Sequence, residues 1–146
     1  MISFAPVSED DFERLLALRV EAMGPHLRRL GRFDPARSRV RFREAFDPET
    51  MRLIHADGVF AGCVTLARKD DHHWLGQFYI VPAHQGRGLG TKLLALLLAE
   101  TDASGLPVRM SVLKRNPAAR LYERHGFRRT GEDEWDVYYE RPAGRR

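Results

Sequence analysis

The chain has 146 residues, a length typical of one domain, and 43% of them are hydrophobic, which is enough to bury a core. The single cysteine, Cys63, excludes an internal disulfide, and the first residues lack the cationic start and apolar stretch of a signal peptide. The longest leucine-rich run, "LLALLLA", is much shorter than the roughly 18 residues of a membrane span. We therefore expect one domain, residues 1–146, in a reducing, cytoplasmic setting with no membrane partner.

The net charge of +4 is concentrated in one segment. Nine arginines lie between Arg14 and Arg43, against two acids, Glu21 and Asp34. Clustered arginines can neutralise nucleic-acid phosphates, but most arginine-rich helical faces are simply solvated, and no aromatic stacking platform is interleaved here. We expect no nucleic-acid partner, keep nucleic-acid binding as a third alternative, and take the segment to indicate an anionic small substrate or partner.

The first third of the chain predicts one strand and two helices. Residues 2–7 alternate like a strand, and Ser8 followed by Asp11 resembles a capping box at a helix start. Pro25 is expected to interrupt this helix. A second helix is expected to run through the arginine-rich segment toward Phe46.

The middle of the chain predicts a hairpin, a third strand and a leucine-rich helix. Two strand-like runs within residues 51–67 flank Asp57-Gly58, a strong hairpin signal, and residues 72–81 form the next strand. A glycine-rich turn then leads into a helix closed by Gly105. The leucines expected on the buried face of that helix include Leu89, Leu93, Leu96 and Leu97.

The last third predicts a strand over 107–113, a helix over 116–127 and a final strand over 135–140. Asn116 followed by Pro117 is typical of a helix N-cap and first helical position. The whole order is β-α-α-β-β-β-α-β-α-β-β, which mixes hairpins with crossover helices. That order predicts an α/β (α+β) fold in which helices cover a mixed sheet.

The turn before the leucine-rich helix contains three glycines in five positions, Gly86, Gly88 and Gly90. Such a turn lets the free amides of a helix N-terminus wrap around an anion. Two common phosphate loops are excluded by counting, because a dinucleotide fingerprint needs glycine where Thr91 stands and a P-loop needs Gly-Lys rather than Gly90-Thr91-Lys92.

What remains, "VPAHQGRGLGTKLL", is similar to the Q/R-x-x-G-x-G/A motif of the GNAT superfamily of acetyl-CoA-dependent N-acetyltransferases. The segment "NPAARLYERHGF" resembles the next motif of that superfamily, one strand further on. The resemblance implies a single GNAT-like domain with a mixed, mostly antiparallel sheet of about seven strands flanked by about four helices. It also implies that two strands splay apart at the cofactor slot.

The resemblance further implies acetyl-CoA as co-substrate. No metal is expected, because the adjacent His72 and His73 would point to opposite faces of a strand and could not bind one ion together. By the same resemblance, Ile80 and Val81 bind the pantetheine arm through their backbone, and Asn116 and Ala119 contact that arm. The diphosphate contacts fall on a longer set, Gln85, Gly86, Arg87, Gly88, Gly90 and Thr91.

The implied reaction is direct attack of a primary amine on the thioester in a ternary complex. Tyr122 is expected to protonate the leaving thiolate. Many relatives carry a carboxylate base on the strand before the glycine loop, where this chain has Gln77. We therefore expect a water chain held by Gln77 or Tyr79, on a strand face shared with His73. Weaker candidates for the base are Asp34, Glu44 and His73 itself.

The family usually forms its acceptor site from the first helices, so Arg19, Phe33, Arg37 and Tyr79 are expected to line it. Arginines there suggest an acceptor that carries both an amine and a carboxylate or other anion, such as an amino acid derivative or a peptide end. A homodimer is common among look-alikes. The leading alternative, suggested by the missing carboxylate, is a non-catalytic acyl-CoA-binding or regulatory module.

Overall fold

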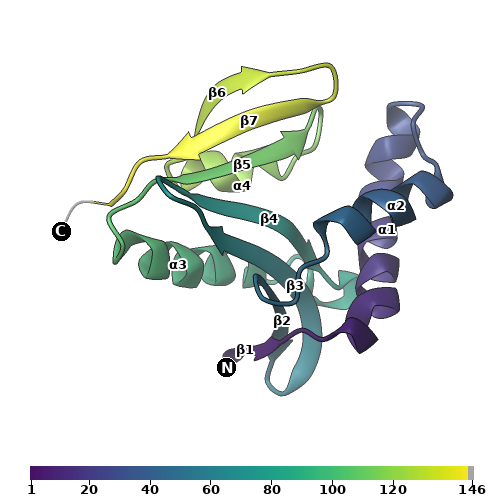
Figure 1. Ribbon diagram of the computed structural model, residues 1–146, viewed down its shortest axis with the longest axis horizontal. Helices are drawn as coiled ribbons and strands as arrows, with labels where there is room; N and C mark the ends of the chain where they lie inside the picture. The colour runs from purple at the N-terminus through teal and green to yellow at the C-terminus, as the bar shows by residue number, and fades with distance from the viewer. Residues whose placement is uncertain (145–146) are drawn as a thin grey trace. The chain divides into compact units, whose positions relative to one another are not determined.

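A computed structural model describes residues 1–144, so the last two residues of the expected 1–146 domain lie outside the described part. The predicted element order is confirmed (Figure 1). The helices are α1 (Phe12–Arg29), α2 (Pro35–Ala45), α3 (Leu89–Asp102) and α4 (Ala119–Arg124), with short 3-10 turns η1 (Glu9–Asp11) and η2 (Pro82–His84). The strands are β1 (Ile2–Pro6), β2 (Met51–Ala56), β3 (Val59–Arg68), β4 (His73–Ile80), β5 (Val108–Leu113), β6 (Arg128–Glu132) and β7 (Asp136–Arg141).

The seven strands form one mixed sheet in the order β1-β2-β3-β4-β5-β7-β6, as the fold prediction required. The β4–β5 pair is parallel, and the pairs β1–β2, β2–β3, β5–β7 and β6–β7 are antiparallel. Contacts within the chain group its residues into two compact units, 1–65 with 77–85 and 66–76 with 86–146. Over residues 1–144, no helix has both the length and the apolar character needed to cross a bilayer.

In the first unit, the β2–β3 hairpin turns at the predicted pair, with Asp57 at φ 52° and Gly58 at φ 81°, the left-handed geometry that such turns need. Helices α1 and α2 cover a core whose members come from both helices and the three strands. The rings of Phe12, Phe42 and the partly buried Phe46 contact one another in tilted and edge-on arrangements, with centroids 5.2 to 5.8 Å apart. The other buried members are Val7, Leu15, Leu16, Leu18, Met51, Leu53 and Cys63.

The prediction that Pro25 interrupts the first helix is wrong, since α1 runs through it to Arg29. A proline inside a helix removes one hydrogen bond and crowds the preceding turn, which costs about 3 kcal/mol without forcing the helix to stop. The residue before it is Gly24, which is buried against the ring of Phe33. The local cost of the proline is therefore borne within a helix that is packed at the residue before it.

In the second unit, β5 pairs with β7 and β7 with β6, while β4 contributes the parallel pairs His73↔Val108 and Trp74↔Arg109. Of the leucines expected on the buried face of α3, Leu93 and Leu97 are buried, Leu89 is half-buried, and Leu96 is not buried. Leu96 is 47% exposed, because the helix buries Leu93, Leu94, Leu97, Leu98 and Thr101 instead. These positions repeat every three and four residues, as one face of a helix requires.

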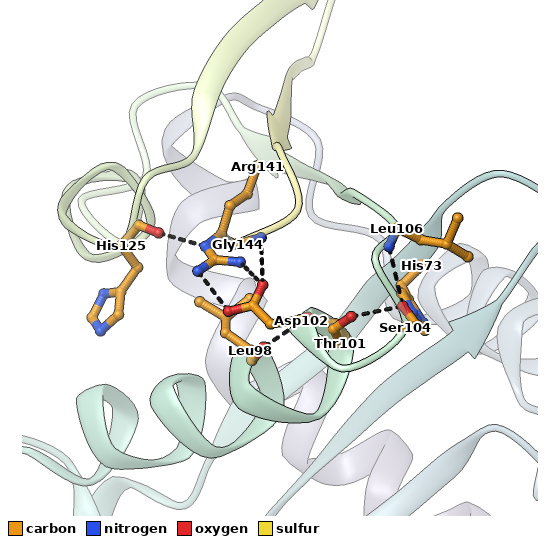
Figure 2. Close-up of polar contacts among 9 residues, drawn as sticks. All are labelled: His73, Leu98, Thr101, Asp102, Ser104, Leu106, His125, Arg141 and Gly144. Carbon is orange, nitrogen blue, oxygen red and sulfur yellow. Dashed lines mark hydrogen bonds and ion pairs between the residues drawn. The ribbon is translucent and has the colours of Figure 1, made fainter. Parts of the chain in front are cut away.

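A bidentate ion pair ties the end of β7 to the end of α3 (Figure 2). Arg141 donates from Nη1 and Nη2 to the two carboxylate oxygens of Asp102, at 2.7 and 3.2 Å, and from Nε to the carbonyl of His125 at 2.9 Å. The amide of Gly144 donates to the same carboxylate. The hydrogen bond from Arg141 is the main reason that the pKa of Asp102 lies below its ordinary value of 3.8.

We expect Asp102→Asn to lower the free energy of unfolding by about 2 kcal/mol at neutral pH, because one charge-assisted pair is lost. Since the pKa of Asp102 is depressed in the folded state, its stabilisation is complete above about pH 4 and is lost as pH falls through the folded-state value. The difference in the free energy of unfolding between wild type and Asp102→Asn, measured by urea denaturation, should therefore become smaller in acid. Asp71→Asn, at a side chain 74% exposed, is the control, and an equal loss in both variants would contradict this account.

Candidate functional site

The end of β4 has an irregular backbone at a residue the sequence analysis singled out. Gln77 has φ 43°, a left-handed conformation that is rare for a residue with a side chain. Its carbonyl accepts a hydrogen bond from the Cys63 thiol at 3.3 Å. Burial raises the pKa of Cys63 to about 12, so this thiol stays protonated and can donate its hydrogen to the backbone of β4.

Strand β3 approaches this part of β4 very closely. A Cβ placed on Gly62 would lie 2.1 Å from the carbonyl oxygen of Tyr79 and 3.2 Å from the Cα of Ile80. Both atoms belong to the backbone and cannot rotate away. Only glycine therefore fits at position 62 while β4 keeps its course.

Gly62→Ala should lower the free energy of unfolding by at least about 2 kcal/mol, because the backbone of β4 must shift to admit the methyl group. The matched control is Gly131→Ala in β6, where a Cβ would meet nothing within 4 Å. Thermal denaturation of both variants gives the comparison. Equal melting temperatures would show that β3 and β4 are not held at this separation.

The two residues expected to bind a cofactor arm through their backbone differ in what they offer. Val81 makes two backbone hydrogen bonds: its amide donates to the Ala61 carbonyl at 2.7 Å, and its carbonyl accepts from the His84 amide at 2.8 Å. Successive amides of an extended strand point to opposite sides, so the amide of Ile80 points away from β3. The carbonyl of Ile80 accepts from the side chain of Gln85 at 2.9 Å. The amide of Val81 is therefore already engaged with β3, while its carbonyl keeps a second lone pair. The backbone roles expected of Ile80 and Val81 stay predictions.

The turn before α3 has the geometry of an anion site. Gly86 and Gly88 lie at φ 77° and 75°, and a Cβ on either would meet nothing within 4 Å. Gly88 is the N-cap of α3, and no side chain caps that end. The first amide with a helical partner is that of Lys92, which donates to the Gly88 carbonyl at 3.2 Å.

The amides of Leu89, Gly90 and Thr91 thus precede the first helical hydrogen bond and have no helical partner. Arg87 and Thr91 are exposed beside them. Successive free amides after left-handed residues form a concave donor set that suits a phosphate or diphosphate. These residues fit the group that the glycine pattern implies.

Helix α4 starts later than expected. Asn116 is not its N-cap; that position is held by Ala118, whose amide donates to the Asn116 side chain at 2.9 Å. The Asn116 side chain therefore closes a turn that immediately precedes α4, because Asn and Asp side chains can accept from the amide two residues further on. Tyr122 is 7% exposed, and its ring packs edge-on against Phe127 with centroids 5.8 Å apart.

A family model described as "Acetyltransferase (GNAT) domain" matches residues 47–129, which is more than half of the chain and includes both motifs. The chain belongs to the GNAT acetyltransferase family.

Solved structures share the GNAT fold with this chain at low sequence identity. The PaiA N-acetyltransferase of Thermoplasma acidophilum, solved with coenzyme A, is 19% identical, with a TM-score of 0.76 over 97% of this chain and 99% of that one. The ribosomal-protein-S18-alanine N-acetyltransferase of Escherichia coli is 19% identical, with a TM-score of 0.72 over 100% and 96%. The N-acetylglutamate synthase of Neisseria gonorrhoeae, solved with coenzyme A and L-arginine, is 16% identical, with a TM-score of 0.65 over 99% of this chain and 34% of that one.

Three of the expected site residues of this GNAT protein meet in the first unit. The Nη1 atom of Arg19 donates to Gln77 Oε1 at 2.8 Å and to the Tyr79 hydroxyl at 3.3 Å. The Tyr79 hydroxyl lies 3.1 Å from the same Gln77 oxygen and 3.0 Å from the sulfur of Met23. Arg19 is 8% exposed, so this cluster replaces solvent around its guanidinium group.

The other expected acceptor residues have ordinary surroundings. The guanidinium carbon of Arg28 lies 4.2 Å from the ring centroid of Phe33, and the same ring packs against Gly24. Arg37 is exposed near the start of α2, where its amide donates to the N-cap Asp34 at 3.2 Å.

Two of the three weaker candidates for the base, Asp34 and His73, make structural hydrogen bonds in this GNAT domain. Asp34 caps α2, and Glu44 is exposed on that helix. The buried His73 bonds through Nε2 to the Ser104 hydroxyl at 2.7 Å (Figure 2). That hydroxyl gives its only hydrogen to the Thr101 carbonyl at 2.6 Å, so His73 is the donor of the pair.

Burial is the main cause that lowers the pKa of His73. The expectation that His73 shares a strand face with Gln77 and Tyr79 stays a prediction; His73 bonds to Ser104, and the other two residues bond to Arg19.

Proposed function

We propose that this protein transfers an acetyl group from acetyl-CoA to a primary amine of a small molecule or peptide, by direct attack in a ternary complex. The observation that carries the proposal is the uncapped N-terminus of α3 behind two left-handed glycines. In the proposal, the amides from Gly88 to Thr91 hold the diphosphate. Gln85 and Gly86 shape the loop, and Arg87 adds its charge.

The backbone at the end of β4 is proposed to meet the thioester arm. The amide of Ile80 supports this role because it points away from β3, whereas that of Val81 is engaged. An N–H fixed toward the thioester oxygen stabilises the negative charge that amine attack creates. Asn116 and Ala119 are proposed to contact the arm from the start of α4.

Bond making and breaking follow from the chemistry of a thioester. The amine nitrogen forms a bond to the carbonyl carbon, the carbon–sulfur bond breaks, and the leaving thiolate takes a proton that we assign to the hydroxyl of Tyr122. The nitrogen loses one proton as the amide forms, and that proton, carried by water, restores the Tyr122 phenol. The burial of Tyr122 on α4 supports the assignment, because a buried phenol is held in one orientation. The proton that the ammonium form of the amine must lose passes to water.

Gln77 is not the base in this proposal. An amide does not accept a proton at useful pH, and Gln77 Oε1 already lies within hydrogen-bond distance of two donors, Arg19 Nη1 and the Tyr79 hydroxyl. The other polar group of the Gln77 side chain is its NH₂ group, which can donate hydrogen bonds but cannot accept a proton. It can hold a water or a substrate oxygen, and we propose that it does so.

The arginine-rich segment gives little support to nucleic-acid binding. Arg14 pairs with Asp11 at 3.0 Å, Arg39 pairs with Glu13 and Arg43 with Glu9, so acids of the preceding segment neutralise part of the charge. The non-catalytic alternative has more support, because the position of the usual carboxylate is an amide bonded to Arg19.

Turnover separates the enzyme from the binding module. With acetyl-CoA and a library of primary amines, we expect release of coenzyme A thiol together with an acetylated amine found by mass spectrometry. If acetyl-CoA binds but no amine is acetylated, the protein is an acyl-CoA-binding module. Control reactions without amine measure hydrolysis of the thioester.

A further inference from the structure

Arg19 is a buried cation without an acidic partner. Its side chain is only 8% exposed, and within residues 1–144 no carboxylate pairs with it. Arg14 and Arg39, by contrast, are about half exposed and pair with Asp11 and Glu13. Burying a charge without a counter-charge is costly, and buried charges in proteins are usually paired, so this cation indicates a place for an anion.

The groups that face Arg19 are uncharged or aromatic. From β4 come the amide of Gln77 and the hydroxyl of Tyr79, and from α2 comes the ring of Phe42, whose centroid is 6.0 Å from the guanidinium carbon. Met23 on α1 contacts the same hydroxyl through its sulfur. None of these groups supplies a negative charge at neutral pH.

The guanidinium group uses only one of its edges. Nη1 makes both hydrogen bonds of the cluster. Within residues 1–144, Nε is buried and has no hydrogen-bond partner. Nη2 also has no partner there, but it is not fully buried. Because Nε is enclosed, a carboxylate oxygen reaches it only if neighbouring side chains move, whereas Nη2 can donate to a carboxylate in a charge-assisted hydrogen bond.

We propose that Arg19 binds the carboxylate of the acceptor, which is therefore an amino acid or another amine with a carboxylate close to the amino group. Gln77 and Tyr79 act as positioning residues that hold Arg19 through Nη1. The inference rests on the proposed function for the amine half of the acceptor. Its carboxylate half rests on Arg19 alone.

The experiment compares amino acids with their carboxamides, which keep the amine and side chain but lose the negative charge. For the wild-type protein, kcat/KM for the best amino acid should exceed that for its carboxamide by about 10-fold or more, as expected when a charge-assisted pair is lost. Aminoalkyl phosphates form a separate arm. A preference for phosphates over carboxylates would overturn the assignment to a carboxylate.

Two variants test Arg19 itself. Arg19→Met keeps the length and apolar stem, and it should bring the ratio between acid and carboxamide close to one. Gln77→Glu places a carboxylate 2.8 Å from Arg19 Nη1 and neutralises it without removing it, so the same loss of preference is expected in a chain that keeps its buried arginine. Arg41→Met, on the exposed side of α2, is the matched control and should keep the preference.

Binding in the presence of coenzyme A decides the matter if no amine is acetylated. A mixture of amino acids should then raise the melting temperature of the wild type and of Arg41→Met, but not of Arg19→Met or Gln77→Glu, and their carboxamides should have no effect. Acetylation without a preference for carboxylates would overturn the inference and leave the proposed function intact. A rise in melting temperature that depends on the carboxylate, without acetylation of any amine, would overturn the proposed function and support the inference about Arg19.

Discussion

Gly88→Ala should weaken the binding of acetyl-CoA by about 100-fold. At φ 75° an alanine is strained by about 1 to 2 kcal/mol, and it relieves the strain by leaving the left-handed region. The amides of Gly88 and Leu89 then turn away from the common point at which we place the diphosphate. Losing two charge-assisted hydrogen bonds accounts for a change of this size.

The matched control for this glycine is at the other end of the same helix. Gly105 lies at φ 74°, and a Cβ there would also meet nothing within 4 Å, so Gly105→Ala imposes the same backbone strain. Both variants should lose similar thermal stability, and only Gly88→Ala should lose affinity in calorimetric titration. Equal affinities would mean that the turn before α3 is an ordinary helix entry.

Tyr122→Phe should lower kcat by at least about 100-fold, because proton transfer to a leaving group contributes 10²- to 10⁴-fold. The ring and its edge-on contact with Phe127 are kept, so the fold and the binding of acetyl-CoA should change little. Rates of thiol release at saturating acetyl-CoA and amine measure the effect.

Tyr139→Phe on β7 provides the comparison for Tyr122. Tyr139 is also buried, at 6% exposure, and lies in the same unit. A similar rate in Tyr122→Phe and Tyr139→Phe would remove the assignment of Tyr122 as the acid. A fall in both would indicate a general effect of losing a buried hydroxyl.

The sequence was sufficient for the order of elements because hairpin and helix signals are local. Asp57-Gly58 turns as predicted, since the two residues by themselves favour the left-handed geometry. Pro25 misled for the opposite reason, because whether a proline ends a helix depends on packing that a local pattern does not contain.

The candidate site was predictable only in part. The glycine turn was found because its chemistry belongs to consecutive residues. The cluster of Arg19, Gln77 and Tyr79 joins residues that are 58 and 60 positions apart and depends on a left-handed residue inside a strand. One signal did exist, since Arg19 continues the apolar face of α1 set by Phe12, Leu15 and Leu16, at spacings of three and four.

Isothermal titration of the wild-type protein with acetyl-CoA tests the central claim most directly. We predict one binding site per chain, with an affinity for acetyl-CoA that falls about 100-fold in Gly88→Ala and is kept in Gly105→Ala. No heat in the wild type, or equal binding by both glycine variants, would contradict the claim that the free amides at the start of α3 hold the diphosphate of the cofactor.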